Sequence, residues 1–169
     1  MSTMATRSER SKWSKILAAA AFGGLTVAAS AAGASVSKPR AWYRSLFKSK
    51  ATPPSWVFGP VWTALYTAIA TSGYRTWRQP VSPERSRALK WWGLQLLLNA
   101  AWSPLFFGAH KPKASAVVVG AMVPVIAAYG LTTRKVDKPA AALMIPYLGW
   151  SLFAAYLNGQ IVRKNAFRL

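Results

Sequence analysis

One segment of the sequence carries almost no charge: between Trp56 and Trp77, Arg75 is its single ionisable cation. At a rise of 1.5 Å per residue, about 20 residues are enough to cross the hydrocarbon core of a bilayer. The prolines before Trp56 favour an extended approach, whereas Pro60 fits the first turn of a helix. The segment therefore predicts a membrane-spanning helix over residues 56–77, with an aromatic ring near each interface.

Four further apolar runs have a similar length. With the first, they predict an all-α integral membrane bundle of five transmembrane helices, over about residues 16–36, 56–77, 84–108, 114–133 and 138–162. The later links are short, which predicts antiparallel neighbours. We expect residues 1–15 to be a loose basic tail, residues 16–163 to be a single domain and residues 164–169 to be a C-terminal tail.

The first apolar run has two interpretations. A basic start, an apolar middle and the small residues Ala32, Gly33 and Ala34 are typical of a cleaved signal peptide. The run is longer, however, than the usual signal core of about 7–15 residues. Its small residues would also allow close packing on neighbouring helices. We favour a first helix that is retained.

The chain is strongly basic, with a net charge of +19 and only 3 acidic residues among 169. Basic charge with many aromatic residues is one signature of nucleic-acid binding. Here the cations gather in links between apolar runs, where they would meet anionic lipid head groups. We therefore expect membrane lipids, and no nucleic acid, as partners.

The ionisable residues argue against ordinary catalysis. Glu84 stands at the start of a predicted span, and no carboxylate or histidine falls in the interior of one, whereas acid–base chemistry needs such a group in a protected site. The chain has no cysteine and no cluster of metal-ligating residues, so we predict neither a metal nor a cofactor. His110 could ligand a haem iron, but in its link a solvated side chain is the more typical arrangement.

Two predicted spans carry patterned side chains. Trp62 and Tyr66 are four residues apart and share a helical face, and Gln95, Asn99 and Ser103 form a polar stripe at the same spacing. Polar side chains at membrane depth face the protein interior or a cavity. Helix packing explains the aromatic pair, and hydrogen bonds between helices explain the stripe, as well as a ligand site does.

The connection over residues 37–55 is long. Trp42 to Phe47 predicts a short amphipathic helix at the membrane interface. Long ordered connections are often functional, although a simple interfacial anchor would show the same pattern.

Three separate motifs resemble those of a known family. They are Trp42-Tyr43 followed by Thr52 to Tyr66, Leu98 to Gly108, and Pro146 to Trp150 followed by Phe153-Ala154 and Leu157-Asn158. In this order and spacing they resemble the translocator protein family, also called tryptophan-rich sensory proteins or peripheral-type benzodiazepine receptors. The resemblance implies a five-helix membrane bundle whose ligand cavity is closed by the first loop. It also implies a bacterial cell membrane, or the mitochondrial outer membrane in a eukaryote.

The resemblance further implies ligands and a site. Family ligands include porphyrins such as protoporphyrin IX, sterols such as cholesterol, and synthetic flat apolar compounds. An anionic carboxylate on the ligand would meet a Lys or Arg of the loop, such as Arg40 or Arg44. The matching ligand-binding positions in this chain are Trp42, Tyr43, Trp62, Tyr66, Asn99, Trp102, Trp150, Phe153 and Ala154.

Three functions remain open from the resemblance: a tetrapyrrole receptor or sensor, a porphyrin or sterol transporter, and a light-dependent porphyrin-degrading enzyme in which Trp62 acts. The cholesterol pattern of animal members is broken here, because Gly159 stands where they have tyrosine. This favours tetrapyrroles and a bacterial member. The resemblance also implies a homodimer, for which Gly93, Ala100 and Ala101 on the third helix are candidate contacts.

Overall fold

A computed structural model describes the backbone of residues 2–36 and 41–168, and the side chains of residues 12–31 and 41–167. The described chain is helical and contains no strand, which confirms the all-α prediction. The main elements are α1 (Ser2–Val36), α2 (Ala41–Ser45), α3 (Ser55–Trp77), α4 (Pro83–Ser103), a π-helix η1 (Pro104–Gly108), α5 (Pro112–Arg134), α6 (Lys138–Ala142), α7 (Ile145–Lys164) and a short 3₁₀ helix (Ala166–Arg168).

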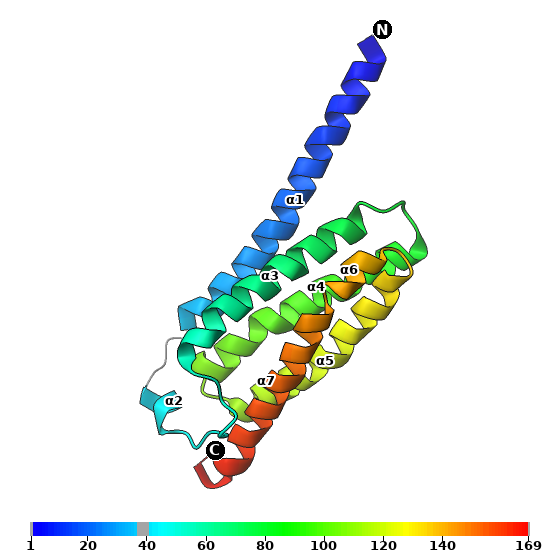
Figure 1. The fold of residues 1–169 in the computed structure, drawn as a ribbon. Coiled ribbons are helices and arrows are strands. Elements are labelled where there is room, and N and C mark those ends of the chain that lie inside the picture. The colour runs from blue at the N-terminus through cyan, green and yellow to red at the C-terminus, as the bar shows by residue number, and fades with distance from the viewer. Residues whose placement is uncertain (1, 37–40, 169) are drawn as a thin grey trace.

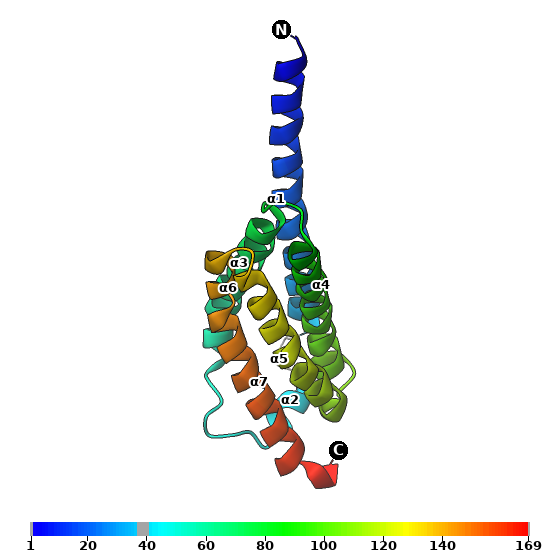
Figure 2. The same ribbon diagram turned by 90° about the vertical axis from the view of Figure 1, so that its right-hand side faces the viewer.

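The long helices run side by side as an elongated bundle (Figure 1). α4 packs against α5, α5 packs against α7, and α1 lies along both α3 and α4. The N-terminal part of α1 projects beyond one end of the bundle (Figures 1 and 2). α2 and the C-terminus lie together at the opposite end.

Three stretches of the described chain are long and apolar enough to cross a membrane: Lys12–Ala31, Pro112–Arg134 and Lys138–Lys164. No more than 28% of any of these spans is buried inside the protein. Large apolar side chains such as Leu97, Val117 and Leu152 therefore point outward. A continuous apolar exterior of this kind is the surface that a lipid bilayer covers.

α1 begins at Ser2, so the part of the predicted loose tail that the structure describes, residues 2–15, is helical. The first 22 residues contain neither glycine nor proline, and nothing in their backbone stops a helix there. Further along, the Phe22 ring meets the indole of Trp92 edge-on, with 4.7 Å between ring centroids. A side chain at Gly73 would overlap both rings, so glycine permits this close approach. The side chains of Ala32, Gly33 and Ala34 lie outside the described residues.

Prolines interrupt two of the predicted helices. Pro146 cannot donate a backbone hydrogen bond, and its ring disfavours helix through Ala142. The span predicted over residues 138–162 is therefore divided into α6 and α7, with Leu143 and Met144 in the turn between them. Pro104 likewise ends the α-helical part of α4, and a π-helix follows in which the N–H of Ala109 donates to the Pro104 carbonyl at 2.8 Å.

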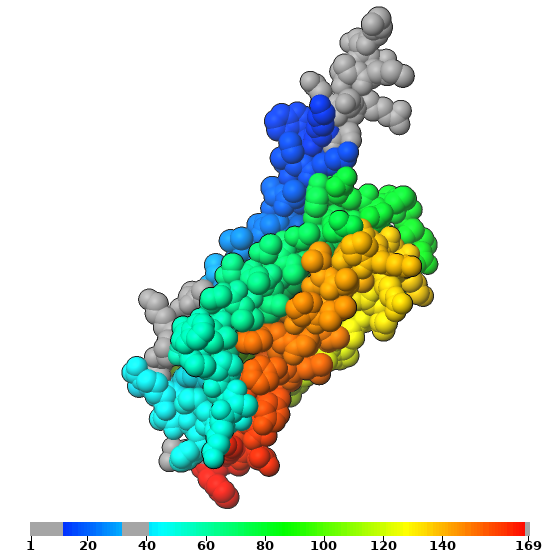
Figure 3. All heavy atoms as spheres, viewed as in Figure 1, coloured from blue at the N-terminus to red at the C-terminus, as the bar shows by residue number. Residues whose placement is uncertain are grey.

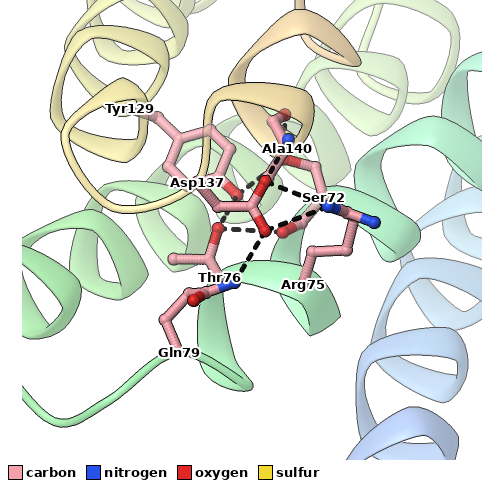
Figure 4. A network of polar contacts seen from close by, with 7 residues as sticks. All are labelled: Ser72, Arg75, Thr76, Gln79, Tyr129, Asp137 and Ala140. Atoms are coloured by element: carbon pink, nitrogen blue, oxygen red, sulfur yellow. Dashed lines mark hydrogen bonds and ion pairs between the residues drawn. The ribbon is translucent and has the colours of Figure 1, made fainter.

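A polar network joins α3, α5 and α6 at the end of the bundle away from α2 (Figure 4). Asp137 caps α6 by accepting from the Ala140 N–H at 2.8 Å. Arg75, the single charge of the α3 segment, forms an ion pair with Asp137 at 3.2 Å. The Tyr129 hydroxyl lies 2.8 Å from the Ser72 hydroxyl and closes the network from α5. The network joins three helices at this end of the bundle, while Nε of Arg75 is buried without a hydrogen-bond partner.

Candidate functional site

Two adjoining cavities lie between α3, α4 and α7. Their volumes are about 350 Å³ and about 550 Å³. The smaller one lies deeper between the helices and reaches Ser30 of α1, Val119 and Met122. The larger one extends under the loop that contains α2. Residues that line both are Phe58, Trp62, Trp102, Ser103 and Ala154.

Nine aromatic side chains, from α2, α3, α4, η1 and α7, line the two cavities. α3 contributes Phe58, Trp62 and Tyr66 because these positions are four residues apart and share one face. Trp62 meets Tyr66 at 5.3 Å and Trp150 of α7 at 6.5 Å, measured between ring centroids. Aromatic pairs at such distances contribute about 0.5–1.5 kcal/mol beyond area burial. The rings thus hold one another in place and leave their remaining faces toward the cavity.

The π-helix supplies the wall on the α4 side. Its wider turn places Phe106 and Phe107 next to each other at 4.8 Å, and Phe106 stacks on Trp102 at 5.3 Å. Both phenylalanines line the larger cavity. A π-helical turn inside an α-helix is often found at a functional site.

Asn99 links three helices at the floor of the smaller cavity. Its Oδ1 accepts a hydrogen bond from the Tyr66 hydroxyl at 2.7 Å, and its Nδ2 donates to the Tyr147 hydroxyl at 3.0 Å. Asn99 also lines the cavity. Asn99 therefore both forms hydrogen bonds between helices and faces a cavity, the two roles that the polar stripe suggested. Ser103 lines both cavities, whereas Gln95 is fully buried in the bundle.

The loop after α1 covers one end of the larger cavity. Tyr43 of α2 meets Phe106 and Phe107 edge-on at 6.0 Å and 5.4 Å between ring centroids, and it lines the cavity with Lys48. Burial raises the pKa of the Tyr43 phenol and lowers the pKa of the Lys48 ammonium. The loop residues lie against the C-terminal end of α7 on the surface of the molecule (Figure 3).

Asn165 fastens this loop to the end of α7. Its Oδ1 accepts from the Phe47 N–H at 3.0 Å, and its Nδ2 donates to the Phe47 carbonyl at 2.9 Å. Lys164 adds a hydrogen bond from its ammonium to the Lys48 carbonyl at 3.1 Å. The side chain of Asn165 is buried, so its hydrogen bonds to the loop are shielded from water. They fix the position of the loop over the cavity.

Most of the residues proposed from sequence lie around these cavities. Trp42 does not line either one: it stacks on His110 at 4.3 Å and meets Phe106 edge-on. Arg44 is exposed and does not line them, and Arg40 lies outside the described residues. Those that do line a cavity are Tyr43, Trp62, Tyr66, Asn99, Trp102, Trp150, Phe153 and Ala154.

Several cavity residues were missed from sequence. A step of four back from Trp62 would have found Phe58. Phe106 and Phe107 lie four residues beyond the wall residues Trp102 and Ser103, so the same step would have found them as well. Lys48 reaches the cavity only because the loop folds back, which no periodicity indicates. Two polar atoms of the described wall residues are buried without a hydrogen-bond partner, namely Nε1 of Trp102 and Oδ1 of Asn158.

An all-helical bundle with apolar outer faces and an internal aromatic cavity under a loop is the arrangement of a membrane protein built around a small-molecule site. The chain belongs to the TspO/MBR family, whose sequence pattern matches residues 16–163.

Relatives from animals and bacteria cover most of the chain. The translocator protein of Ovis aries is 39% identical over 129 residues, which are 75% of this chain and 76% of that protein. The tryptophan-rich protein TspO of Chlorobaculum tepidum is 37% identical over 157 residues, which are 89% of this chain and 98% of that protein. The tryptophan-rich sensory protein of Cereibacter sphaeroides is 34% identical over 128 residues, which are 76% of this chain and 79% of that protein.

Proposed function

We propose that this chain is a membrane receptor that binds a flat tetrapyrrole, such as protoporphyrin IX, in the paired cavities between α3, α4 and α7. The observation that carries the proposal is the wall of aromatic rings. Flat faces of Trp62, Trp102 and Trp150 come from three different helices onto one cavity. The volume of about 550 Å³ falls in the range of about 300–1,000 Å³ that is typical of small-molecule sites.

The wall chemistry favours a flat, largely apolar ligand with a few polar groups. Rings stack on rings or meet them edge-on, which favours a planar aromatic ligand over a compact polar one. Tyr66 and Asn99 supply such polar groups at the wall of the smaller cavity. The sensory name of the Cereibacter sphaeroides relative also fits a receptor.

The same proposal includes the membrane arrangement. α3 and α4 lie in the bundle beside the three apolar spans (Figure 1). We infer that they cross the membrane too, giving five spans with the covering loop at one face. Arg75 lies close to the end of α3 and is paired with Asp137, so its charge does not oppose insertion.

Tryptophan fluorescence in the dark tests the proposal. Purified protein is titrated with protoporphyrin IX beside the variants Trp62→Ala, Trp150→Ala and Trp56→Ala. Trp56 is 76% exposed at the start of α3 and lines neither cavity, so it is the matched control. We expect saturable binding that the first two changes weaken and the control leaves intact. Binding that is indifferent to all three changes would place the ligand elsewhere.

Photochemical degradation of the porphyrin is the second candidate. The observation that favours it is the central place of Trp62, an oxidisable indole that lines both cavities. A photosensitising porphyrin beside it could react with dioxygen without any acid or base from the protein. Illumination of the complex in air tests this: loss of porphyrin absorbance that requires Trp62 supports an enzyme, and stable absorbance supports a receptor.

A further inference from the structure

The larger cavity contains one unusual wall residue. Among the described residues that line the two cavities, Lys48 is the only charged side chain. Its neighbours on the wall are aromatic, apolar or neutral polar. An ammonium beside an apolar space is poorly solvated on that side, so it favours an anion there.

Among the described residues, no carboxylate pairs with Lys48. The chain has 3 acidic residues, of which Glu84 and Asp137 stand at helix starts and Glu9 precedes the described side chains. Lys48 Nζ instead donates to the carbonyls of Tyr43 and Leu46 at 2.7 Å and 2.9 Å. Carbonyl dipoles orient the ammonium but leave its net charge uncompensated.

The loop that covers the larger cavity fixes the position of the Lys48 ammonium. Lys48 Nζ lies 4.7 Å from the centroid of the Tyr43 ring, and that ring packs on Phe107 of the cavity wall. Asn165 and Lys164 hold the backbone on either side of Lys48 through Phe47 and the Lys48 carbonyl. The ammonium is therefore held at the edge of the aromatic cavity, under the loop.

We propose that Lys48 binds a carboxylate of the ligand, so that the cavity selects flat apolar molecules bearing an acid at one edge over neutral molecules of the same shape. The inference rests on the proposed tetrapyrrole function and names the ligand class of that site. The apolar ring system would occupy the aromatic wall while the acid meets Lys48. Lys48 Nζ also donates a third hydrogen bond, to the backbone carbonyl of Arg44 at 3.3 Å. This bond is the longest of the three, so a ligand carboxylate would replace it first. Charge-assisted pairing of this kind is stronger than a neutral hydrogen bond.

The test compares protoporphyrin IX, a diacid, with its dimethyl ester, which keeps the ring system but carries no acid. Both are titrated in the dark against wild type, Lys48→Gln, Lys48→Arg and Lys50→Gln. Lys50 is exposed two residues further along the same loop and lines neither cavity, so it controls for general loop charge.

We expect wild type to bind the diacid about five- to tenfold more tightly than the ester, the size of a partly exposed charged hydrogen bond. Lys48→Gln should remove this preference by weakening the diacid alone. Lys48→Arg and Lys50→Gln should keep it. Raised salt should weaken the diacid in wild type more than in Lys48→Gln.

Three results would overturn the inference. Equal affinity of wild type for diacid and ester would show that no cation selects the acid. Equal weakening of both ligands in Lys48→Gln would show that Lys48 only supports the loop through its carbonyl contacts. An effect of Lys50→Gln as large as that of Lys48→Gln would assign the preference to loop charge in general. Failure of wild type to bind either compound would instead refute the tetrapyrrole function, and the inference with it.

Discussion

Asn99 shows how one side chain serves both structure and site. Its amide satisfies the hydroxyls of Tyr66 and Tyr147 at once, and it also faces the smaller cavity. An isolated polar contact between membrane helices contributes about 0.6 kcal/mol on average. Removing Asn99 has a larger cost, because it takes the partner from two hydroxyls that are both at least partly buried.

We predict that Asn99→Leu lowers the free energy of unfolding in detergent by about 1–3 kcal/mol, since leucine has a similar size but no polar atoms. Thermal or denaturant unfolding measures this loss. Leu97→Ala is the control on the same helix, because Leu97 is 66% exposed and faces outward. Asn99→Leu protein as stable as wild type would mean that the two tyrosines find other partners.

Residue spacing predicted part of the site. The step of four between Trp62 and Tyr66 correctly indicated a shared face. In the structure, Ser82 and Asp137 cap α4 and α6, and their side chains accept from the N–H groups of Arg85 and Ala140. Trp42, a candidate ligand-binding residue, stacks on His110 and lines neither cavity, because α2 turns its two aromatic side chains to different neighbours. Nothing in the sequence alone indicated that Lys48 faces the cavity.

At the scale of elements, prolines made the helices less regular than their apolar runs suggest. Pro146 divides the last span into α6 and α7, and Pro104 precedes the π-helix that places Phe106 and Phe107 on the wall. Hydropathy detects an apolar stretch but not a change of helical pitch within it.

On the outer face of α4, Gly93 is exposed, while Ala100 packs against the core. The predicted dimer contact through this helix stays a prediction.

The covering loop is the element most dependent on one contact. We predict that Asn165→Ala frees the loop, because both hydrogen bonds to the Phe47 backbone are lost. Hydrogen exchange at the Phe47 amide should become faster by about tenfold, and a bound ligand should dissociate faster. Arg163→Ala, an exposed change at the same end of α7, should alter neither rate. Unchanged exchange in Asn165→Ala would show that the rings of α2 hold the loop without it.

At the scale of the whole molecule, the five membrane crossings that we propose would place the links alternately on two sides. The chain has no cysteine, so single cysteines can be introduced and labelled without a background. We predict that a cysteine at Ser49 or Ala109 reacts from one side of the membrane, and a cysteine at Val81 or Lys135 from the other. Impermeant labelling of oriented vesicles measures this. Ser49 and Val81 labelled from the same side would refute the crossing of α3.

The apolar exterior and the aromatic cavity differ in how well they can be predicted from the sequence. The exterior follows from hydropathy, which is why a membrane bundle could be recognised from sequence. The cavity depends on how three helices and a loop meet, and individual runs carry little information about it. Family motifs supplied most of the correct wall residues, because they record that three-dimensional arrangement indirectly.

Filling the cavity is the most direct test that it holds the ligand. Ala154 of α7 lines both cavities, whereas Leu152 is 53% exposed and faces outward. Ala154→Phe and Leu152→Phe both leave all 9 tryptophans in place, so fluorescence quenching by protoporphyrin IX can be compared directly with wild type. Saturable binding that is lost in Ala154→Phe and kept in Leu152→Phe is the predicted result. Binding of wild-type strength by a folded Ala154→Phe protein would contradict a tetrapyrrole site between α3, α4 and α7.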